Sequence, residues 1–439
     1  MTTLPLPQQL ERLDTDRLRR YQEHLDFYSG RQWPGRARPG ERRLTFNYAK
    51  AIVDKLASYV MTGMTVNVQP WDATPEAADR ARRAQEALHQ AYADNALEAL
   101  DLDTELDASI LGDGAFKVTW DAEAGRVRIT SPDVQGIFAW WQADDPSRVW
   151  RVASRYRLSL EEFRQVGIGS RSDSEPPLEQ QAQGPVTVVE AWTADVFQLW
   201  AGNAIVQESK NPYGVIPFVL FPNLRVPKAF WGESDLPPLM EPARELNRAL
   251  SQLSAIVELS GNPIAVLEGV ERAEDIAVQP GAVWELPERA KAYLLDLLQG
   301  GGVKLHIDFI DLLYRAIHDI SEAPRTSFGD NPQALSGVAL EMEMNPLMQR
   351  VRRKRLVRAA AYQRRNELVL RLLEQHTGAA YLPVRQEIVW GQVLPQDRGR
   401  LVRDEQTLVA AGLHSKRTAM EALGVRDVDA EVERVREEG

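Results

Sequence analysis

The chain has 439 residues and a net charge of −11, with 63 Asp and Glu against 52 Lys and Arg. Its length allows about three domains, and the hydrophobic share of 44% is that of a folded globular protein. Cysteine is absent, which excludes disulfides, thiolate zinc sites, iron–sulfur clusters and cysteine nucleophiles. The acidic balance argues against a protein that coats nucleic acid electrostatically, because such proteins need an excess of Lys and Arg.

Motifs for catalysis and for membrane insertion are missing. No Gly-Lys pair occurs, so no Walker A loop can form, and neither a His-Glu pair nor a Gly-x-Ser-x-Gly elbow is found. We expect no membrane span and no signal peptide. His306, Asp308 and Asp311 are the best metal-like cluster, and we interpret them as polar groups on a helix surface. We therefore expect no enzyme and no catalytic, cofactor or metal site, with a metal-dependent nuclease kept as an alternative.

The first third of the chain is dominated by helical periodicity. Residues 6–30 and 46–62 are predicted as helices, the second ending at Gly63. A strand over 65–69 follows, and then an alanine-rich, charged helical stretch over 75–111, which Gly112-Asp113-Gly114 closes.

From 115 to 222 the hydrophobic period shortens towards two, which predicts an antiparallel sheet region. The predicted strands are 115–120, 126–130, 149–156, 186–192 and 215–221. A helix near 159–166 and an exposed loop over 169–185 interrupt them. The tryptophans of this region are interpreted as sheet packing and not as a platform for stacking bases.

Two helices with apolar seams are predicted after Pro237-Pro238. The first seam follows spacings of four and three, through Leu239, Ala243, Leu246, Leu250, Leu253 and Val257. The second helix, over 304–321, carries Phe309, Leu313, Ala316 and Ile320. We expect an antiparallel pair that holds an insert at its tip, with strands over 264–267 and 282–286 and a short helix near 288–298. The pair packs either against its own domain or beside identical copies in a ring.

Helical periodicity fails between 323 and 333, where Pro324, Gly329 and Pro332 predict a loop. A long helix over 335–376 follows. Its positions 350–371 hold nine basic residues and a single acid. Two interpretations are open: these cations pair with acidic faces of the same chain or a neighbour, or they contact phosphate. A small helical end piece over 398–439 completes the chain.

Several short motifs follow one another along the chain. They are YQEHLDFYSG at 21–30, Asn47-Tyr48-Ala49, Asn211-Pro212-Tyr213-Gly214, Gly232-Glu233-Ser234-Asp235, the run from Leu335 to Leu340, and a tail pattern from Trp390 to Arg434. In this order, over nearly the whole chain, they resemble the portal proteins of tailed bacteriophages.

The resemblance implies an α+β, mostly helical fold that forms a ring oligomer, usually of twelve subunits. It would have a wing containing antiparallel strands, a stem made of a helical hairpin, a small α/β clip and a helical crown. The parts would be a wing over 1–235 and 336–395, a stem over 236–260 and 304–322, a clip over 261–303, a channel loop over 323–335 and a crown over 396–439.

The resemblance also implies a function. The ring would occupy one vertex of the virion capsid, after assembly in the host cytoplasm, and double-stranded DNA would pass through it in packaging and ejection without sequence-specific contacts. Its partners would be the terminase motor, the capsid or scaffolding protein, and head-completion and tail proteins, with no cofactor and no membrane. Another ring-forming structural protein of a virion or a secretion system is the alternative.

Three sets of residues are predicted to carry this function. The channel loop set is Arg325, Thr326, Ser327, Phe328, Asp330, Asn331 and Gln333. The stem interface set is Leu246, Leu250, Leu253 and Val257, and a possible electrostatic patch is Arg350, Arg352, Arg353 and Arg355. Within the loop, Arg325 either binds phosphate or pairs with a neighbouring carboxylate. Phe328 is expected to form a hydrophobic rim and not to tuck into the wing.

Overall fold

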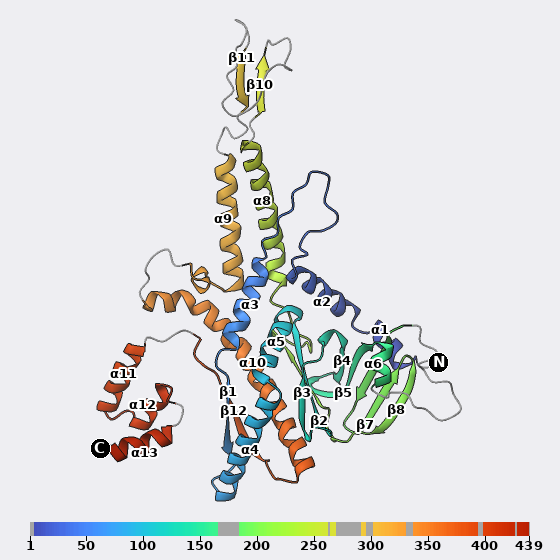
Figure 1. The fold of residues 1–439 in the computed structure, drawn as a ribbon, viewed down its shortest axis with the longest axis vertical. Helices are drawn as coiled ribbons and strands as arrows, with labels where there is room; N and C mark the ends of the chain where they lie inside the picture. The colour runs from blue at the N-terminus through green and yellow to red at the C-terminus, as the bar shows by residue number, and fades with distance from the viewer. Residues whose placement is uncertain are drawn as a thin grey trace. The chain divides into compact units, whose positions relative to one another are not determined.

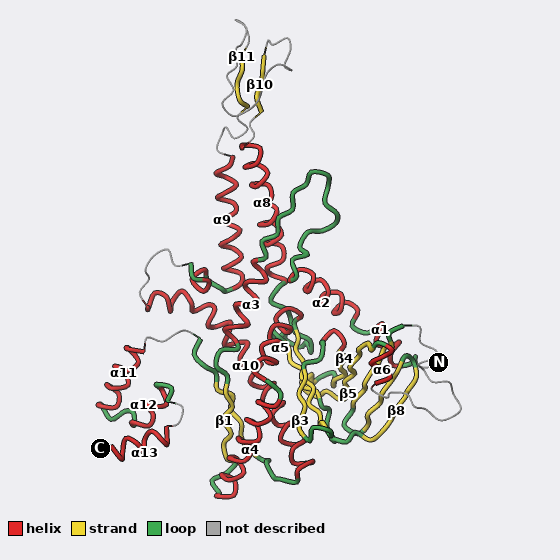
Figure 2. Tube along the Cα trace, viewed as in Figure 1, coloured by secondary structure: helices red, strands yellow, loops and turns green. Residues whose placement is uncertain are grey.

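The computed structural model describes residues 4–165, 184–261, 264–268, 291–295, 302–330, 337–393, 398–425 and 428–438. Helices and antiparallel sheets are mixed along the chain, which confirms the predicted α+β class (Figures 1 and 2). The chain divides into two compact units, Met1–Val389 and Trp390–Gly439. None of the helices in the described part is long and apolar enough to cross a membrane.

The N-terminal helices are shorter than predicted. Helices α1 (Leu6–Arg12) and α2 (Thr15–Tyr28) are separated at Asp14, whose φ is 56°, so one helix over 6–30 is wrong. Helices α4 (Pro75–Asp94) and α5 (Leu97–Leu111) are likewise separated at Ala96, with φ 47°. A left-handed backbone conformation is uncommon at residues other than glycine. Because Asp14 and Ala96 are not typical helix-breaking residues, the apolar periodicity does not predict either break.

Helix α3 (Tyr48–Val60) lies within its predicted range. The side chain of Asn47 caps its start by accepting a hydrogen bond from the Lys50 N–H. After α3, β1 (Thr65–Pro70) pairs antiparallel with β12 (Val384–Val389), a strand that the sequence analysis did not predict. This pairing joins the beginning of the first unit to its end.

Two antiparallel sheets follow. The first has three strands in the order β3 (Arg126–Thr130), β2 (Asp113–Asp121) and β9 (Phe218–Pro222). The second has five in sequence order: β4 (Ile137–Gln142), β5 (Asp145–Leu158), β6 (Val186–Trp192), β7 (Val196–Ala201) and β8 (Ala204–Lys210). The short helices η1 (Val134–Gly136) and α6 (Leu160–Gln165) lie between these strands in the sequence. The loop predicted over 169–185 falls almost entirely outside the described residues.

Strands β4, β7 and β8 were not predicted. Strand β4 reads Ile-Phe-Ala-Trp-Trp-Gln, an apolar run without alternation. The β7–β8 hairpin does carry a signal, because Gly202-Asn203 is a two-residue turn and Gly202 has φ 56°.

Helices α8 (Pro237–Gly261) and α9 (Gly302–Ser321) form the predicted antiparallel pair and lie side by side (Figure 1). Along the seam of α8 the side chains become more exposed with residue number: Leu246 is buried, Leu250 and Leu253 are half-buried, and Val257 is 61% exposed. Residues after Leu246 therefore have apolar surface that their own chain leaves uncovered.

The insert between α8 and α9 contains a pair of strands. Strand β10 (Ile264–Glu268) pairs antiparallel with β11 (Lys291–Leu295), so the helix predicted near 288–298 is wrong. For residues 291–295, pairing with β10 determines the conformation more strongly than the local preference for a helix. The strand predicted over 282–286 lies outside the described residues.

Helix α10 (Gly337–Thr377) has 41 residues and packs against β9 and β2 of the three-stranded sheet. The ring of Phe116 lies between those of Phe221 and Tyr362, at 5.7 and 5.9 Å between centroids, so aromatic side chains bind α10 to the sheet. The second unit contains the helices α11 (Arg398–Ala410), α12 (Lys416–Ala422) and α13 (Val428–Glu438), as predicted for the helical end piece.

Candidate functional site

The segment between α9 and α10 begins as a short helix and not as an open loop. Helix η2, of 3-10 type, spans Arg325–Phe328, so the loop prediction is wrong for these four residues. Both the N–H and the hydroxyl of Ser327 donate to the carbonyl of Pro324, at 2.9 and 2.6 Å. Gly329 ends the turn with φ 87°, where glycine meets no Cβ penalty. Asn331 and Gln333 of the predicted channel set lie outside the described residues.

His318, in the last turn of α9, fixes the start of this segment. Its Nδ1–H donates to the carbonyl of Ala323 at 2.7 Å, and its ring makes edge contacts with Tyr314 and Phe328. Burial lowers the pKa of His318 below the usual 6.5, and its Nε2 atom is buried without a hydrogen-bond partner among the described residues. The neutral imidazole is therefore the form that fits this position.

The exposed side chains of the segment are largely occupied by contacts within it. Arg325 pairs with Asp330 and lies over the ring of Tyr314, at 4.9 Å from its centroid. Phe328 contacts His318 by its edge and is still 38% exposed. The hydroxyl of Thr326 contacts the sulfur of Met344 on α10 at 3.7 Å. Of the two alternatives for Arg325, the structure has the pair with a neighbouring carboxylate.

Behind this segment, α10 takes part in a buried ionic cluster, formed by Glu105, Asp235, Arg350, Lys354 and Arg358. The Lys354 Nζ contacts Asp235 at 2.6 Å and Glu105 at 3.2 Å, and all three side chains are almost completely buried. Arg350 pairs with Asp235 at 2.7 Å, and Arg358 with Glu105 at 2.6 Å. Glu105 belongs to α5, and Asp235 lies two residues before α8, so the cluster joins three distant parts of the sequence.

The charges in this cluster are mutually dependent. Burial alone would raise the pKa of Asp235, but Lys354 and Arg350 outweigh it and hold that pKa below its usual range. The pKa of Glu105 is likewise lowered, with Arg358 and Lys354 overcoming burial. Both carboxylates are therefore ionised at neutral pH, and the loss of one cation would leave a buried negative charge.

The remaining cations of α10 have different surroundings. Arg365 pairs with the buried Asp101, and Arg353 donates two hydrogen bonds of 2.7 Å to Glu322. Arg355 donates to backbone carbonyls at the end of α3. Arg352 is exposed and has no ion-pair partner in the described part of the chain. These contacts correspond to the first interpretation of the basic helix, pairing within the same chain.

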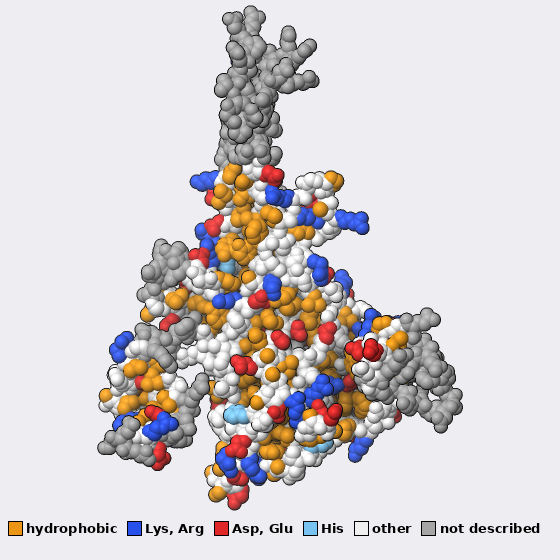
Figure 3. Space-filling view, viewed as in Figure 1, with side chains coloured by type: hydrophobic (Ala, Val, Ile, Leu, Met, Phe, Trp, Pro, Cys, Tyr) orange, Lys and Arg blue, Asp and Glu red, His pale blue; other side chains and the backbone are white. Residues whose placement is uncertain are grey.

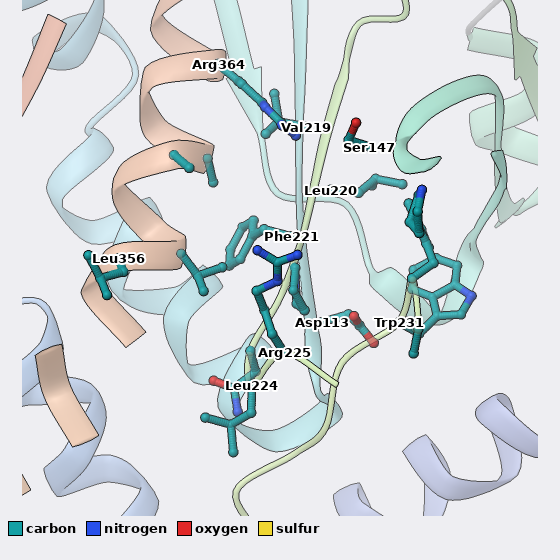
Figure 4. A pocket seen from close by; sticks show the side chains of 18 of the residues that line it. Asp113, Ser147, Val219, Leu220, Phe221, Leu224, Arg225, Trp231, Leu356 and Arg364 are labelled. Atoms are coloured by element: carbon teal, nitrogen blue, oxygen red, sulfur yellow. The ribbon is translucent and has the colours of Figure 1, made fainter. Parts of the chain in front are cut away.

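A cavity of about 1290 Å³ lies beside α10 and was not foreseen from the sequence. In Figure 4, Leu356 of α10 lies on one side, Trp231 on the other, and Phe221 of β9 between them. Arg225 and Arg364 also line it. The lining residues come from chain segments far apart in the sequence, which is why no local pattern indicates the cavity.

Metal binding finds no support in the described residues. No group of three or more His, Asp or Glu side chains there could hold a metal ion. In the cluster considered from the sequence, Asp311 forms an ion pair with Arg315 of the same helix.

Comparison with known proteins places the chain in a family. A comparison with curated proteins gives no match. The family model described as phage portal protein, SPP1 Gp6-like, matches residues 8–439, which is nearly the whole chain. With its antiparallel helix pair α8–α9, its strand-bearing first unit and its small helical second unit, the chain belongs to this family of phage portal proteins.

Proposed function

We propose that this chain forms the portal ring of a tailed phage, usually of twelve subunits, at one vertex of the capsid. Double-stranded DNA passes through the ring in packaging and ejection. The terminase motor docks on it first and head-completion or tail proteins later. The family is one of structural proteins of the virion, which agrees with a chain whose sequence has no nucleotide-binding loop.

The observation that carries this proposal is the apolar surface of the stem. Val257 on α8 and Leu312 on α9 are 61% and 62% exposed, and Leu305 is 71% exposed. Figure 3 shows hydrophobic side chains gathered over the described part of these helices. Contiguous apolar surface on a soluble protein marks an interaction site, and side-by-side packing of identical stems would cover it.

The pairing of the cations in α10 and in η2 favours a channel that lets DNA pass over one that binds its phosphates tightly. A channel protein that neutralised many phosphates would have to break those contacts at every step of translocation. Most cations of α10 are already paired within the chain, and Arg325 is paired with Asp330. The segment between α9 and α10, which we assign to the channel, therefore presents little unpaired positive charge to DNA.

The ring is tested by placing a charge on the exposed stem. Leu312→Asp should give monomers in size-exclusion chromatography with light scattering, because the ring interface would bury an unpaired carboxylate. Leu312 is exposed in the single chain, so the fold should survive, as circular dichroism would show; half-buried Leu250 is a less clean choice. The matched control Leu312→Met keeps an apolar side chain and should keep the ring. An intact ring in Leu312→Asp would contradict the proposed interface.

A further inference from the structure

The segment between α2 and α3, residues 30–46, lies as a strap on stem helix α8. Four contacts in the described residues attach it to one face of α8. The Phe46 N–H donates to Asn247 Oδ1 (2.8 Å), the Asn247 Nδ2–H donates to Gln32 Oε1 (2.6 Å), the Leu44 N–H donates to Ser251 Oγ (3.0 Å), and Arg42 pairs with Glu258 (2.6 Å). The strap follows α8 almost to its end at Gly261.

The tip of the strap has a fixed shape. The Glu41 N–H donates to the Arg38 carbonyl at 2.9 Å across Pro39-Gly40, and Gly40 has φ 75°, as in a type II turn. The guanidinium of Arg43 donates to the carbonyls of Pro34, Gly35 and Arg36. A tip held in this way loses little conformational freedom when it binds a partner.

The strap is strongly basic, with five arginines and one glutamate. Arg31, Arg42 and Arg43 are paired with Asp26, Glu258 and Glu41. Arg36 and Arg38 at the tip are exposed, and the guanidinium of neither forms an ion pair in the part of the chain that the structure describes. The backbone N–H of Arg38 donates to the Glu41 carboxylate at 2.7 Å, which leaves its guanidinium available. Two unpaired cations are thus presented by a rigid tip.

A surface of complementary charge occurs on α9. Leu305, Phe309 and Leu312 form an exposed stripe at spacings of four and three, and the exposed Asp308 lies beside it without an ion-pair partner in the described residues. Asp311, one turn further along, is paired with Arg315, and the exposed Lys304 lies one turn before Asp308, so the negative charge without an ion pair on this face is that of Asp308. This face offers both apolar contact and negative charge.

The strap contact at Glu258 and the side chain of Asp308 lie at similar positions along the axis of the helix pair α8–α9. At 1.5 Å per residue, Glu258 is about 4.5 Å from the end of α8 and Asp308 about 9 Å from the start of α9. These two ends are neighbours because the helices are antiparallel (Figure 1). In the same view the strap and α9 lie on opposite sides of α8, so a strap does not reach the α9 of its own chain.

We infer that the strap of each subunit docks on α9 of the next copy, with Arg36 and Arg38 pairing with Asp308 beside the apolar stripe. In a ring whose axis runs along the stem, rotation to the next subunit does not change the position along that axis, so the tip meets the neighbour's α9 at the level of Asp308. Such a contact is heterologous and closes into a ring. This inference rests on the proposed ring and adds which surfaces meet in it.

Cross-linking in this cysteine-free chain tests the contact. Arg38→Cys and Asp308→Cys are combined in the full-length protein and treated with a short bis-maleimide. The expected result is a ladder of covalent oligomers on a denaturing gel. The control pair, Arg19→Cys on exposed α2 with Asp308→Cys, should give no ladder. Rings that light scattering shows to be intact but that give no ladder would overturn the strap contact and leave the portal proposal standing. Absence of rings in the parent protein would overturn both.

Charge reversal provides the second measurement. Arg36→Glu with Arg38→Glu should shift the ring–monomer equilibrium towards monomers, and adding Asp308→Arg should restore rings. If the Arg36→Glu, Arg38→Glu variant forms normal rings, the proposed pairing of these arginines with Asp308 of the next subunit is contradicted. If it loses binding only to an acidic capsid or scaffolding protein, the strap serves that partner and not the neighbouring subunit.

Discussion

Lys354 is a buried lysine whose ammonium group lies between two carboxylates of different segments. Its side chain reaches from α10 to Glu105 of α5. Its positive charge offsets the cost of burying the carboxylates of Asp235 and Glu105. We infer that the cluster contributes to the specificity of packing, because a shift of α10 would separate buried charges from their partners.

We expect Lys354→Met to lower the free energy of unfolding by about 3–5 kcal/mol, because it fills the space but leaves buried carboxylates without their shared cation. Urea unfolding followed by circular dichroism at one fixed protein concentration measures this. The control is Arg352→Met on the same helix, where an exposed side chain should change stability by about 0.5 kcal/mol or less. Equal effects in the two variants would mean that the cluster has no special role.

The residue types of this cluster are visible in the sequence, but their partners are not. Nine basic residues within 350–371 indicate that acids must be found somewhere. Glu105 and Asp235 are far from α10 in the sequence, and each stands in a segment whose apolar pattern says nothing about it. The pairing depends on tertiary packing, so charge patterning could suggest the kind of contact but not its members.

At the scale of elements, the junction of α9 and η2 depends on the protonation state of one imidazole. The Nδ1–H of His318 donates to Ala323, while its Nε2 is buried without a partner in the described residues. Burial is the main cause that lowers the pKa of His318, and the charge of Arg325 adds to it. The hydrogen bond to Ala323 and the charges of Asp319 and Asp330 act in the opposite direction without outweighing them.

The pH dependence follows from the sign of this shift. The pKa of His318 is lowered in the folded state, so below pH about 6.5 the unfolded chain takes up a proton that the folded chain does not. This group therefore favours the folded state fully above that pH and progressively less as pH falls through 6.5 towards the lowered pKa. We expect the parent to lose more stability between pH 7 and 5 than His318→Gln. Parallel curves for the two proteins would contradict this assignment.

How far the elements could be predicted depended on whether their signal is local. Helices α3, α8, α9 and α10 follow apolar periods of three and four, and their predicted ranges agree with the structure to within a few residues. The breaks at Asp14 and Ala96 come from backbone dihedrals that residue type does not reveal. Strand β12 forms because β1 provides a partner, and β11 because β10 does; neither pairing has a short-range signature.

At the scale of the whole molecule, the proposed portal function would depend on how the segment between α9 and α10 contacts passing DNA. Phe328→Ala removes the exposed edge of η2 and its contact with His318, while the Ser327 bonds that hold the turn remain. We expect normal rings and a changed amount of packaged or retained DNA, measured in a packaging assay with purified motor and capsid. Deleting 327–329 would also remove the hydrogen bonds of Ser327, so the point variant separates function from structure. Unchanged packaging and retention would mean that Phe328 does not meet DNA.

The buried cluster also has a mechanical consequence for such a ring. If α10 slid along its axis by one residue, Lys354 would move about 1.5 Å away from its place between two acids, which strains several short contacts at once. We therefore expect that a load on the segment between α9 and α10 would not be absorbed by slippage of α10. In a ring, α10 would transmit that load to the rest of the first unit, starting at the junction with α9, where Glu322 has φ 55° and accepts hydrogen bonds from Arg353.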